Sequence, residues 1–581
     1  MSGEAARTTS DALVEALHEA GVSVIFANLG SDHPGLIEAL ARARERGQDV
    51  PAVVLCPHES TAMSAAHGYA LASGQAQAVF VHTDVGTANL GGSVHNAARS
   101  RIPVFILAGL TPYTLENELA GTRNSYVNHL QDVHDQHSLV RPYVKWSYDV
   151  RTGSNIKQLV FRALQISDSS PRGPVYMTAA REVLAQHVTT RDLPRERWQP
   201  IAPIPARADL AKELIEALAA ARFPLLITSH LGRNPAAVGK LTRLADALGI
   251  GIVETTPSAM NFAANHPLHL GYTVDELIAE ADLIIAIDTD SPWIISQRTP
   301  ARDVRVFFID PDPLKEDLPL WYLEADHFIR ADSETMLDQL LDLLPAVTDA
   351  AGVVDRVARL TAIHDKQRED WAAHLESTST SLTPESVCSV VNRLIDDSTV
   401  VLNEALTNSA LIARYVPRVE PETMFSNGGT SLGWSGGAAV GFKLARPDRT
   451  VVNLVGDGTY FLSVPSSSYW VSQHYMAPVL TIIFDNGGWN STKQNLIRQY
   501  PEGIADSNDS YWVNLGQSAD LPGIASAAGD AFGVTVSTLA ELEPALVKAF
   551  ERVRGGQSAV VSVRLPAISN QPDDSVNPQD S

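Results

Sequence analysis

Two short apolar runs in the C-terminal third of the 581-residue chain constrain its fold most strongly. The first, residues 451–455, is rich in β-branched residues and stops at Gly456-Asp457-Gly458. The second, residues 479–484, stops at Asp485-Asn486-Gly487-Gly488. Such runs are typical of strands buried on both faces of a parallel sheet. With a helical stretch predicted at about residues 461–474, they form a β-α-β unit, and ligands of such sheets bind at the carboxyl ends of the strands.

The residues that end these two strands suit a diphosphate held through a divalent cation. Asp457 offers a carboxylate oxygen, Asn486 an amide oxygen and Gly488 a backbone carbonyl, and these hard oxygen donors are the ligands that Mg²⁺ prefers. The backbone N–H groups of Gly458 and Thr459 open the following helix and are available to cradle a diphosphate. A Gly-Asp-Gly sequence by itself is also a common turn, so the distance to the second strand end matters.

The spacing of 29 residues from Asp457 to Asn486 resembles a known cofactor motif. In the acetolactate synthase and benzoylformate decarboxylase superfamily, Gly-Asp-Gly is followed at a similar distance by Asn-Asn, and the two together bind thiamine diphosphate (ThDP). The chain departs from this pattern at Asp485, which replaces the first Asn, whereas Asn486 matches the second, the metal ligand of the family. The resemblance implies ThDP and Mg²⁺ as cofactors, with Asp457, Asn486 and Gly488 as the metal ligands.

Composition excludes several other classes of protein. A hydrophobic content of 45% and a charged content of 19% are those of a globular protein. The net charge of −23 disfavours nucleic acid and anionic membranes as partners. Two cysteines are too few for a disulfide framework, and the N-terminus lacks a basic-then-apolar signal pattern, so we expect a cytoplasmic protein. No apolar run reaches the roughly 18 residues that a membrane span needs.

Apolar strands alternate with helical stretches along most of the chain, which predicts an α/β fold with three doubly wound parallel-sheet domains. From the resemblance we expect a pyrimidine-binding domain at 8–188, a central domain at 208–345 and a diphosphate-binding domain at 381–566. Residues 569–581 are almost all polar or proline, and we expect a disordered tail there. No Gly-x-Gly-x-x-Gly sequence follows a strand of the central domain, so dinucleotide binding of the Rossmann type receives no support.

A candidate catalytic residue, Glu59, follows the apolar run at 52–56. On its own it would be an ordinary acidic residue at a helix N-terminus. The ThDP superfamily places one glutamate in this slot, within a sequence similar to the one found here at His58, Glu59, Ala62, Ala66, Gly68 and Tyr69. The resemblance implies that Glu59 faces N1′ of the aminopyrimidine and favours its imino form, while the cofactor carries the carbanion chemistry.

Two further stretches resemble cofactor-binding loops of the family. In residues 428–434, Leu432 matches the bulky apolar residue that bends the cofactor, and we expect its neighbour Ser431 to contact the cofactor as well. Without the resemblance, Leu432 would be equally compatible with an ordinary core position. Thr407 and Asn408 follow a predicted strand and resemble the loop that receives the far diphosphate oxygens.

Candidate substrate contacts are Ser31, His82, Gln136 and Lys493. Ser31 and His82 occupy positions similar to those of a serine and a histidine beside the substrate of benzoylformate decarboxylases. A histidine of ordinary pKa moves protons at neutral pH, although a buried structural histidine is the alternative. Gln136 lies in a segment that borders the substrate in relatives, but the sequence does not separate it from Gln131. Lys493 follows the metal loop and would suit an anionic substrate, with a surface lysine as the alternative.

The resemblance implies a ThDP- and Mg²⁺-dependent enzyme that acts on a 2-oxo acid, by decarboxylation or by transfer of the acyl anion. An alternative is a 2-hydroxyacyl-CoA lyase or an oxalyl-CoA decarboxylase-like enzyme. A flavin-binding synthase or oxidase and a ThDP-binding protein without catalysis are two others, and Glu59 and Leu432 argue against the last. Sites in the family combine two subunits, so we expect self-association as a dimer or homotetramer.

Overall fold

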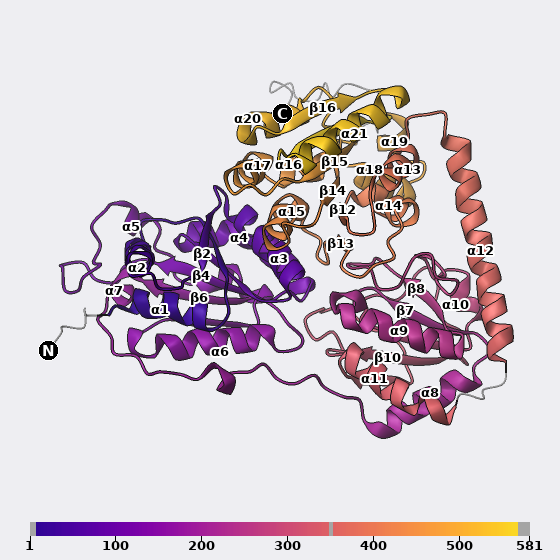
Figure 1. The fold of residues 1–581 in the computed structure, drawn as a ribbon, viewed down its shortest axis with the longest axis horizontal. Coiled ribbons are helices and arrows are strands. Elements are labelled where there is room, and N and C mark those ends of the chain that lie inside the picture. The colour runs from indigo at the N-terminus through magenta and orange to yellow at the C-terminus, as the bar shows by residue number, and fades with distance from the viewer. Residues whose placement is uncertain (1–6, 348–351, 510, 568–581) are drawn as a thin grey trace.

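The computed structural model describes residues 7–347, 352–509 and 511–567. It contains three sheets, each made only of parallel strands and flanked by helices (Figure 1). The predicted architecture of three parallel-sheet α/β domains is thereby confirmed. The predicted disordered tail, 569–581, lies outside the described residues. No helix in the described ranges combines the length and the apolar composition that a membrane span requires.

The first sheet has the strand order β2-β1-β3-β4-β6-β5. Its strands are β1 (Val24–Ala27), β2 (Ala52–Leu55), β3 (Gln77–Val81), β4 (Val104–Leu110), β5 (Trp146–Asp149) and β6 (Val175–Ala180). Its helices are α1 (Thr9–Glu19), α2 (Pro34–Glu45), α3 (Glu59–Ser73), α4 (Thr83–Arg99), α5 (Val127–Leu130), α6 (Ile156–Asp168) and α7 (Arg181–Leu184). β3 and β6 are buried along their whole length, as their continuous apolar sequences predict.

The central sheet has the strand order β11-β10-β9-β7-β8. Its strands are β7 (Pro224–Thr228), β8 (Gly251–Glu254), β9 (Leu283–Ile287), β10 (Arg305–Asp310) and β11 (His327–Arg330). Its helices are α8 (Ala208–Ala220), α9 (Pro235–Leu248), α10 (Leu277–Glu280) and α11 (Ser333–Leu343). The helix α12 (Val353–Thr378) has 26 residues and runs beside the central domain toward the third (Figure 1). It is therefore the connector between the two domains.

The third sheet has the strand order β13-β12-β14-β15-β17-β16. Its strands are β12 (Val400–Glu404), β13 (Met424–Ser426), β14 (Val451–Gly456), β15 (Leu480–Asp485), β16 (Phe532–Val536) and β17 (Ala559–Arg564). Its helices are α13 (Pro384–Leu394), α14 (Ser409–Tyr415), α15 (Trp434–Ala445), α16 (Asp457–Leu462), α17 (Pro465–His474), α18 (Asn490–Gln499), α19 (Ile504–Ser507), α20 (Leu521–Gly529) and α21 (Leu539–Arg554).

The helical stretch predicted at 461–474 is two helices rather than one. Helix α16 begins directly at Asp457, and α17 begins at Pro465 after Val464, whose φ is +48°. A proline is tolerated at the first position of a helix, where its missing N–H has no partner to bond. The proline therefore starts a second helix instead of continuing the first.

The first and third domains meet through α3 and α15, which approach each other at backbone distance. A Cβ atom on Gly68 of α3 would overlap the carbonyl oxygen of Ala438, and one on Gly441 of α15 would overlap that of Ala65. Close packing of this kind requires residues without a side chain at the crossing. The sequence of α3 that contains Glu59 therefore also fixes how the two domains pack.

Replacing Gly68 by alanine should weaken this crossing. We expect a loss of about 1–3 kcal/mol, since overpacking forces the backbones apart and outweighs the gain in helix propensity. Gly91→Ala on α4 is the matched control, because nothing lies within 4 Å of a Cβ atom at that position. Thermal midpoints followed by circular dichroism compare the two variants. Equal midpoints would show that the crossing tolerates a side chain.

Candidate active site

The carboxyl ends of β14 and β15 bring three predicted metal ligands to one edge of the third sheet. The register pairs Gly456 with Phe484, so that Asp457 and Asp485 follow on neighbouring strands. Asp457 is 3% exposed, and its Oδ2 atom has no hydrogen-bond partner. Burial raises the pKa of Asp457 to about 7, with a smaller contribution from the charge of Asp485. A cation bound beside this buried carboxyl group would stabilise its charged form.

Asn486 and Gly488 form the turn beside Asp457. The Asn486 side-chain oxygen accepts the Gly488 N–H at 3.3 Å. Gly488 has a φ of +151°, and a Cβ atom there would overlap the carbonyl of Val513, so only glycine fits. Its own carbonyl accepts the Asn490 N–H at 3.1 Å and keeps a second lone pair.

The departure from the family pattern at Asp485 has a structural explanation. Its Oδ1 atom accepts the Gly487 N–H at 3.2 Å, a bond that the oxygen of an asparagine would also accept. Burial raises the pKa of Asp485. The side chain therefore shapes the turn, and the substitution leaves the geometry of Asn486 intact.

The predicted cofactor-binding residues surround this edge. Gly458 and Thr459 form the buried first turn of α16, and a Cβ atom on Gly458 would lie 2.7 Å from the Trp489 ring. Thr407 and Asn408 lie in the short 3₁₀ turn after β12, beside β14 and α18.

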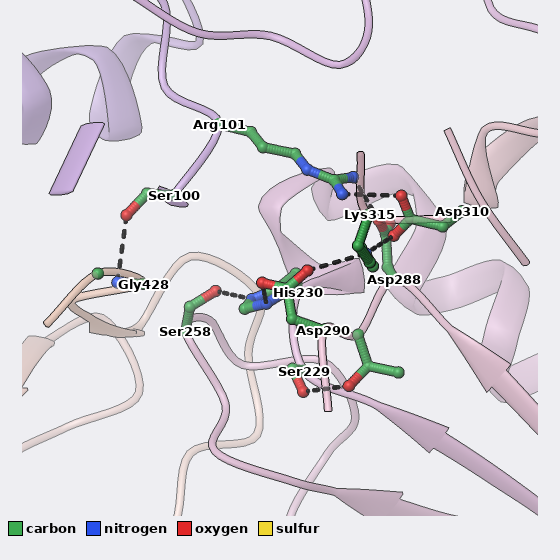
Figure 2. Close-up of polar contacts among 12 residues, drawn as sticks. Ser100, Arg101, Ser229, His230, Ser258, Asp288, Asp290, Asp310, Lys315 and Gly428 are labelled. Carbon is green, nitrogen blue, oxygen red and sulfur yellow. Dashed lines mark hydrogen bonds and ion pairs between the residues drawn. The ribbon is translucent and has the colours of Figure 1, made fainter. Parts of the chain in front are cut away.

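The loop before α15 carries Ser431 and Leu432. Leu432 is half-buried and is therefore not an ordinary core residue. The backbone of Ser431 is held by Asn96 of α4, whose Oδ1 accepts the Ser431 N–H at 3.1 Å and whose Nδ2 donates to its carbonyl at 2.8 Å. Ser100 adds a contact at 3.1 Å to the Gly428 N–H of the same loop (Figure 2). The first domain thus positions this loop.

Sequence reasoning missed Glu404, the last residue of β12. It is buried, and its carboxylate accepts the N–H groups of Gly433, Trp434 and Ser435 at 2.8–3.2 Å. Burial raises its pKa. Glu404 therefore ties the loop of Leu432 to the Thr407 turn, and the only signal in the sequence was a charged residue at the end of a strand that begins with three apolar residues.

In the first domain, Glu59 begins α3 and is 8% exposed. Its Oε2 atom accepts the Asn89 side-chain amide of α4 at 3.0 Å, and Gly86 faces its other oxygen. Asn89 and Asn96 are seven residues apart on α4, which places them on one face about 10 Å from each other. One helix therefore positions both Glu59 and the loop of Leu432.

His82 lies in a hydrogen-bonded chain with Asp32 and Gln131. Its Nδ1 is 2.6 Å from Asp32 Oδ1, and its Nε2 is 3.1 Å from Gln131 Oε1. The hydrogen bond with Asp32 raises the pKa of His82, and burial opposes this shift. A histidine in such a chain has a fixed orientation and holds its proton to higher pH.

The remaining predicted substrate contacts are arranged differently. Gln136 is buried, and its amide donates to the Gly109 carbonyl and to Tyr176 Oη, each at 2.9 Å, so that Gln131 rather than Gln136 contacts His82. The Ser31 side chain is exposed near Asp32. Lys493 on α18 pairs with Asp509 at 3.3 Å, which offsets its charge.

The carboxyl edge of the central sheet is occupied by the chain's own charged groups (Figure 2). Arg101 of the first domain is 2.7 Å from Asp310, and Lys315 lies 2.8 Å from both Asp310 and Asp290. His230 contacts Asp290 at 3.3 Å. Ligands of open α/β sheets bind at this edge, and here it carries ion pairs beside a cavity of about 400 Å³ that Arg101, Asp290 and Lys315 help to line.

Comparisons with known proteins agree with this arrangement. Family models of thiamine pyrophosphate enzymes match the chain at 7–139 (N-terminal TPP binding domain), 211–340 (central domain) and 406–563 (C-terminal TPP binding domain). The chain belongs to the thiamine pyrophosphate enzyme family. It is therefore a ThDP-dependent enzyme of the 2-oxo acid decarboxylase or carboligase type.

Three relatives span most of the chain. It is 24% identical to the acetolactate synthase isozyme 3 large subunit of Escherichia coli (strain K12), covering 96% of this chain and 94% of that protein. It is 26% identical to a benzoylformate decarboxylase of Pseudomonas aeruginosa, covering 84% and 87%. It is 23% identical to human (Homo sapiens) 2-hydroxyacyl-CoA lyase 2, covering 84% and 79%.

Solved structures share the fold. A ThDP-dependent 4-hydroxybenzoylformate decarboxylase from Rhodococcus jostii RHA1 has a TM-score of 0.78 at 19% identity and covers 97% of this chain and 99% of its own. A benzoylformate decarboxylase from Polynucleobacter necessarius has a TM-score of 0.78 at 20% identity, covering 97% and 100%. At these identities the likeness concerns the fold.

The Glu404 contacts generate a prediction. Glu404→Gln keeps the shape but leaves one acceptor oxygen for the three N–H groups, so the loop of Leu432 should loosen and the affinity for ThDP should fall about tenfold, the worth of one charged hydrogen bond. Titration of ThDP by fluorescence quenching measures this, with Glu420→Gln at an exposed position as the control. A lower thermal midpoint with unchanged ThDP affinity would mean that Glu404 only caps α15.

Proposed function

We propose that the enzyme uses ThDP and Mg²⁺ to break or form the carbon–carbon bond next to the carbonyl group of a 2-oxo acid. The observation that carries this proposal is the buried carboxylate oxygen of Asp457, which has no partner at the carboxyl edge of the third sheet. A cation offsets the cost of burying such a group, and a Mg²⁺ ion bound to a diphosphate fits that position.

The metal would be held by Asp457, Asn486 and the carbonyl of Gly488. Within the described ranges, no group of three or more His, Cys, Asp or Glu side chains is arranged to hold a metal ion. A site with one carboxylate therefore needs ligands of other kinds, and Mg²⁺ commonly takes them from phosphate oxygens and water. This is the donor set that a bound diphosphate would complete.

ThDP would lie across the same edge and supply the electron sink that stabilises a carbanion. Gly458 and Thr459 would hold its diphosphate through the N–H groups of α16, and Thr407 and Asn408 through their turn. Leu432 and Ser431 would support its bent conformation. These assignments rest on the positions of the residues around one sheet edge.

Glu59 would hold and return the proton at the aminopyrimidine. We further propose that a second subunit completes the site, in a dimer or homotetramer. His82, fixed by Asp32 and Gln131, would move a proton at the substrate, with Ser31 nearby. We also propose a cytoplasmic location, since both cysteines are buried free thiols.

The similar proteins support a 2-oxo acid as the substrate, because the benzoylformate decarboxylase and the solved 4-hydroxybenzoylformate decarboxylase each act on one by name. The central domain has no Gly-x-Gly-x-x-Gly sequence, which disfavours a dinucleotide bound there in the Rossmann manner. The similarity to human 2-hydroxyacyl-CoA lyase 2 makes CoA thioesters the second candidate class of substrate. A screen of 2-oxo acids and 2-hydroxyacyl-CoA esters for carbon dioxide or aldehyde separates the two, and turnover of the CoA esters alone would contradict the first.

Glu59→Gln should abolish most of the activity and leave ThDP bound. We expect kcat to fall by about 10²–10⁴-fold, the usual contribution of a positioned proton-transfer group. Glu45→Gln, at an exposed position of α2, is the control and should behave as the wild type. Steady-state rates on the best substrate, together with a ThDP titration, make the measurement. Unchanged turnover would refute the role of Glu59.

The affinity for Mg²⁺ should depend on pH through Asp457. With a pKa of about 7, this carboxyl binds a proton below that pH, and the proton competes with the metal. Between about pH 7 and pH 6 we expect the affinity to fall about fivefold, since the carboxyl goes from about half protonated to almost fully protonated. Asp457→Asn should bind Mg²⁺ more weakly and without this pH dependence. Titrations of Mg²⁺ in the presence of ThDP test both, and a flat wild-type profile would argue against Asp457 as the ligand.

A further inference from the structure

A cavity outside the candidate active site lies where the central domain, α12 and α14 meet. Its volume is about 260 Å³, and its lining includes Tyr272, His364, Arg368, Trp371 and Arg414. His364, Arg368 and Trp371 lie on one face of α12 at spacings of four and seven residues. Arg414 belongs to α14, and Tyr272 lies in the loop between β8 and α10. Three separate parts of the chain therefore build this cavity.

Two guanidinium groups lie against the same aromatic ring in the cavity wall. The guanidinium of Arg368 lies 4.2 Å from the centre of the Trp371 ring, and that of Arg414 lies 4.9 Å from the centre of the same ring. Burial, with the charge of Arg414, lowers the pKa of Arg368. In the described residues, neither arginine forms an ion pair with a carboxylate. Two neighbouring cations without an anion repel each other, and this makes the arrangement costly.

The nearest carboxylate of the central domain is already engaged. Glu254 accepts from His269 Nε2 at 2.9 Å and from Asn261 at 2.8 Å. Arg368 Nη2 is 2.9 Å from the other ring nitrogen of His269 and donates to the Ala264 carbonyl at 2.7 Å. Glu254 therefore acts on Arg368 only through His269, and it leaves the guanidinium charge without a direct partner.

Each arginine also carries a buried donor that has no acceptor. These donors are Nη1 of Arg368 and Nε of Arg414. Buried polar groups in proteins are nearly always hydrogen-bonded, so an unpaired donor indicates a bound water or ion. Both guanidinium groups line the cavity, so a ligand there with several acceptor oxygens would lie beside two cationic groups rich in N–H donors.

We propose that this cavity binds a small oxyanion with two negative charges, a phosphate group or a short dicarboxylate. Such an ion would offset the charge of both guanidinium groups and accept hydrogen bonds from them, and arginine is the side chain best shaped for this task. A volume of about 260 Å³ exceeds a single water by roughly eightfold and accommodates such an ion with part of its carbon chain. Its binding would link α12 to α14, and so join the central domain to the third.

The test is a titration of the holoenzyme, with ThDP and Mg²⁺ at saturation so that the cofactor site is filled. Inorganic phosphate, succinate and acetate are added at constant ionic strength, because salt alone screens surface charges. Calorimetry and the thermal midpoint are followed. We expect saturable binding and a raised midpoint with phosphate or succinate, and neither with acetate. The stronger of the two dianions identifies the chemistry of the ligand.

Arg368→Gln and Arg414→Gln should each weaken this binding about tenfold or more, the worth of one charged hydrogen bond. Arg359→Gln is the matched control, because Arg359 lies on the same helix but pairs with Glu280 at the surface. Lysine at either position keeps the charge without the planar fork and should bind with intermediate affinity. Equal binding by wild type and both glutamine variants, or no saturable binding by the wild type, would overturn the proposal.

Discussion

The burial of the Asp457 carboxylate is the constraint on which the site depends. A carboxylate with an unpartnered oxygen at the end of a buried strand is costly unless a cation is present. The parallel register of β14 and β15 places Asn486 and Gly488 at the same edge, where they would bind the same cation as Asp457 and so offset this cost. The third sheet thus holds a buried carboxylate at an edge where a metal-bound diphosphate would offset the energetic cost of its burial.

The first domain holds a loop of the third domain through α4, the helix that also positions Glu59. Asn89 holds the Glu59 side chain, and Asn96 holds the backbone of Ser431 two turns further along. Glu404 secures the other end of the same loop from β12. The loop of Leu432 is therefore held from two domains, which explains how a half-buried leucine keeps one position without a core around it.

The sequence predicted most of the fold, because buried parallel strands are continuous apolar runs and their ends are marked by glycine and polar residues. It also predicted that Asp457 and Asn486 lie at the same sheet edge, since their spacing along the chain reflects one β-α-β unit. The sequence did not predict which of several similar side chains faces the site, because that depends on packing. Gln131 and Gln136 are similar in sequence context, yet one faces His82 and the other Tyr176. Glu404 was missed because its carboxylate is bound mainly by backbone N–H groups, with Asn427 as its side-chain partner, and it has no charged partner that the sequence would reveal.

The contact between α3 and α15 has a consequence for motion. Where Gly68 and Gly441 lie, no flexible side chain separates the two backbones, so these helices cannot slide past each other by changing rotamers. The first and third domains of one chain should then move as a single rigid block.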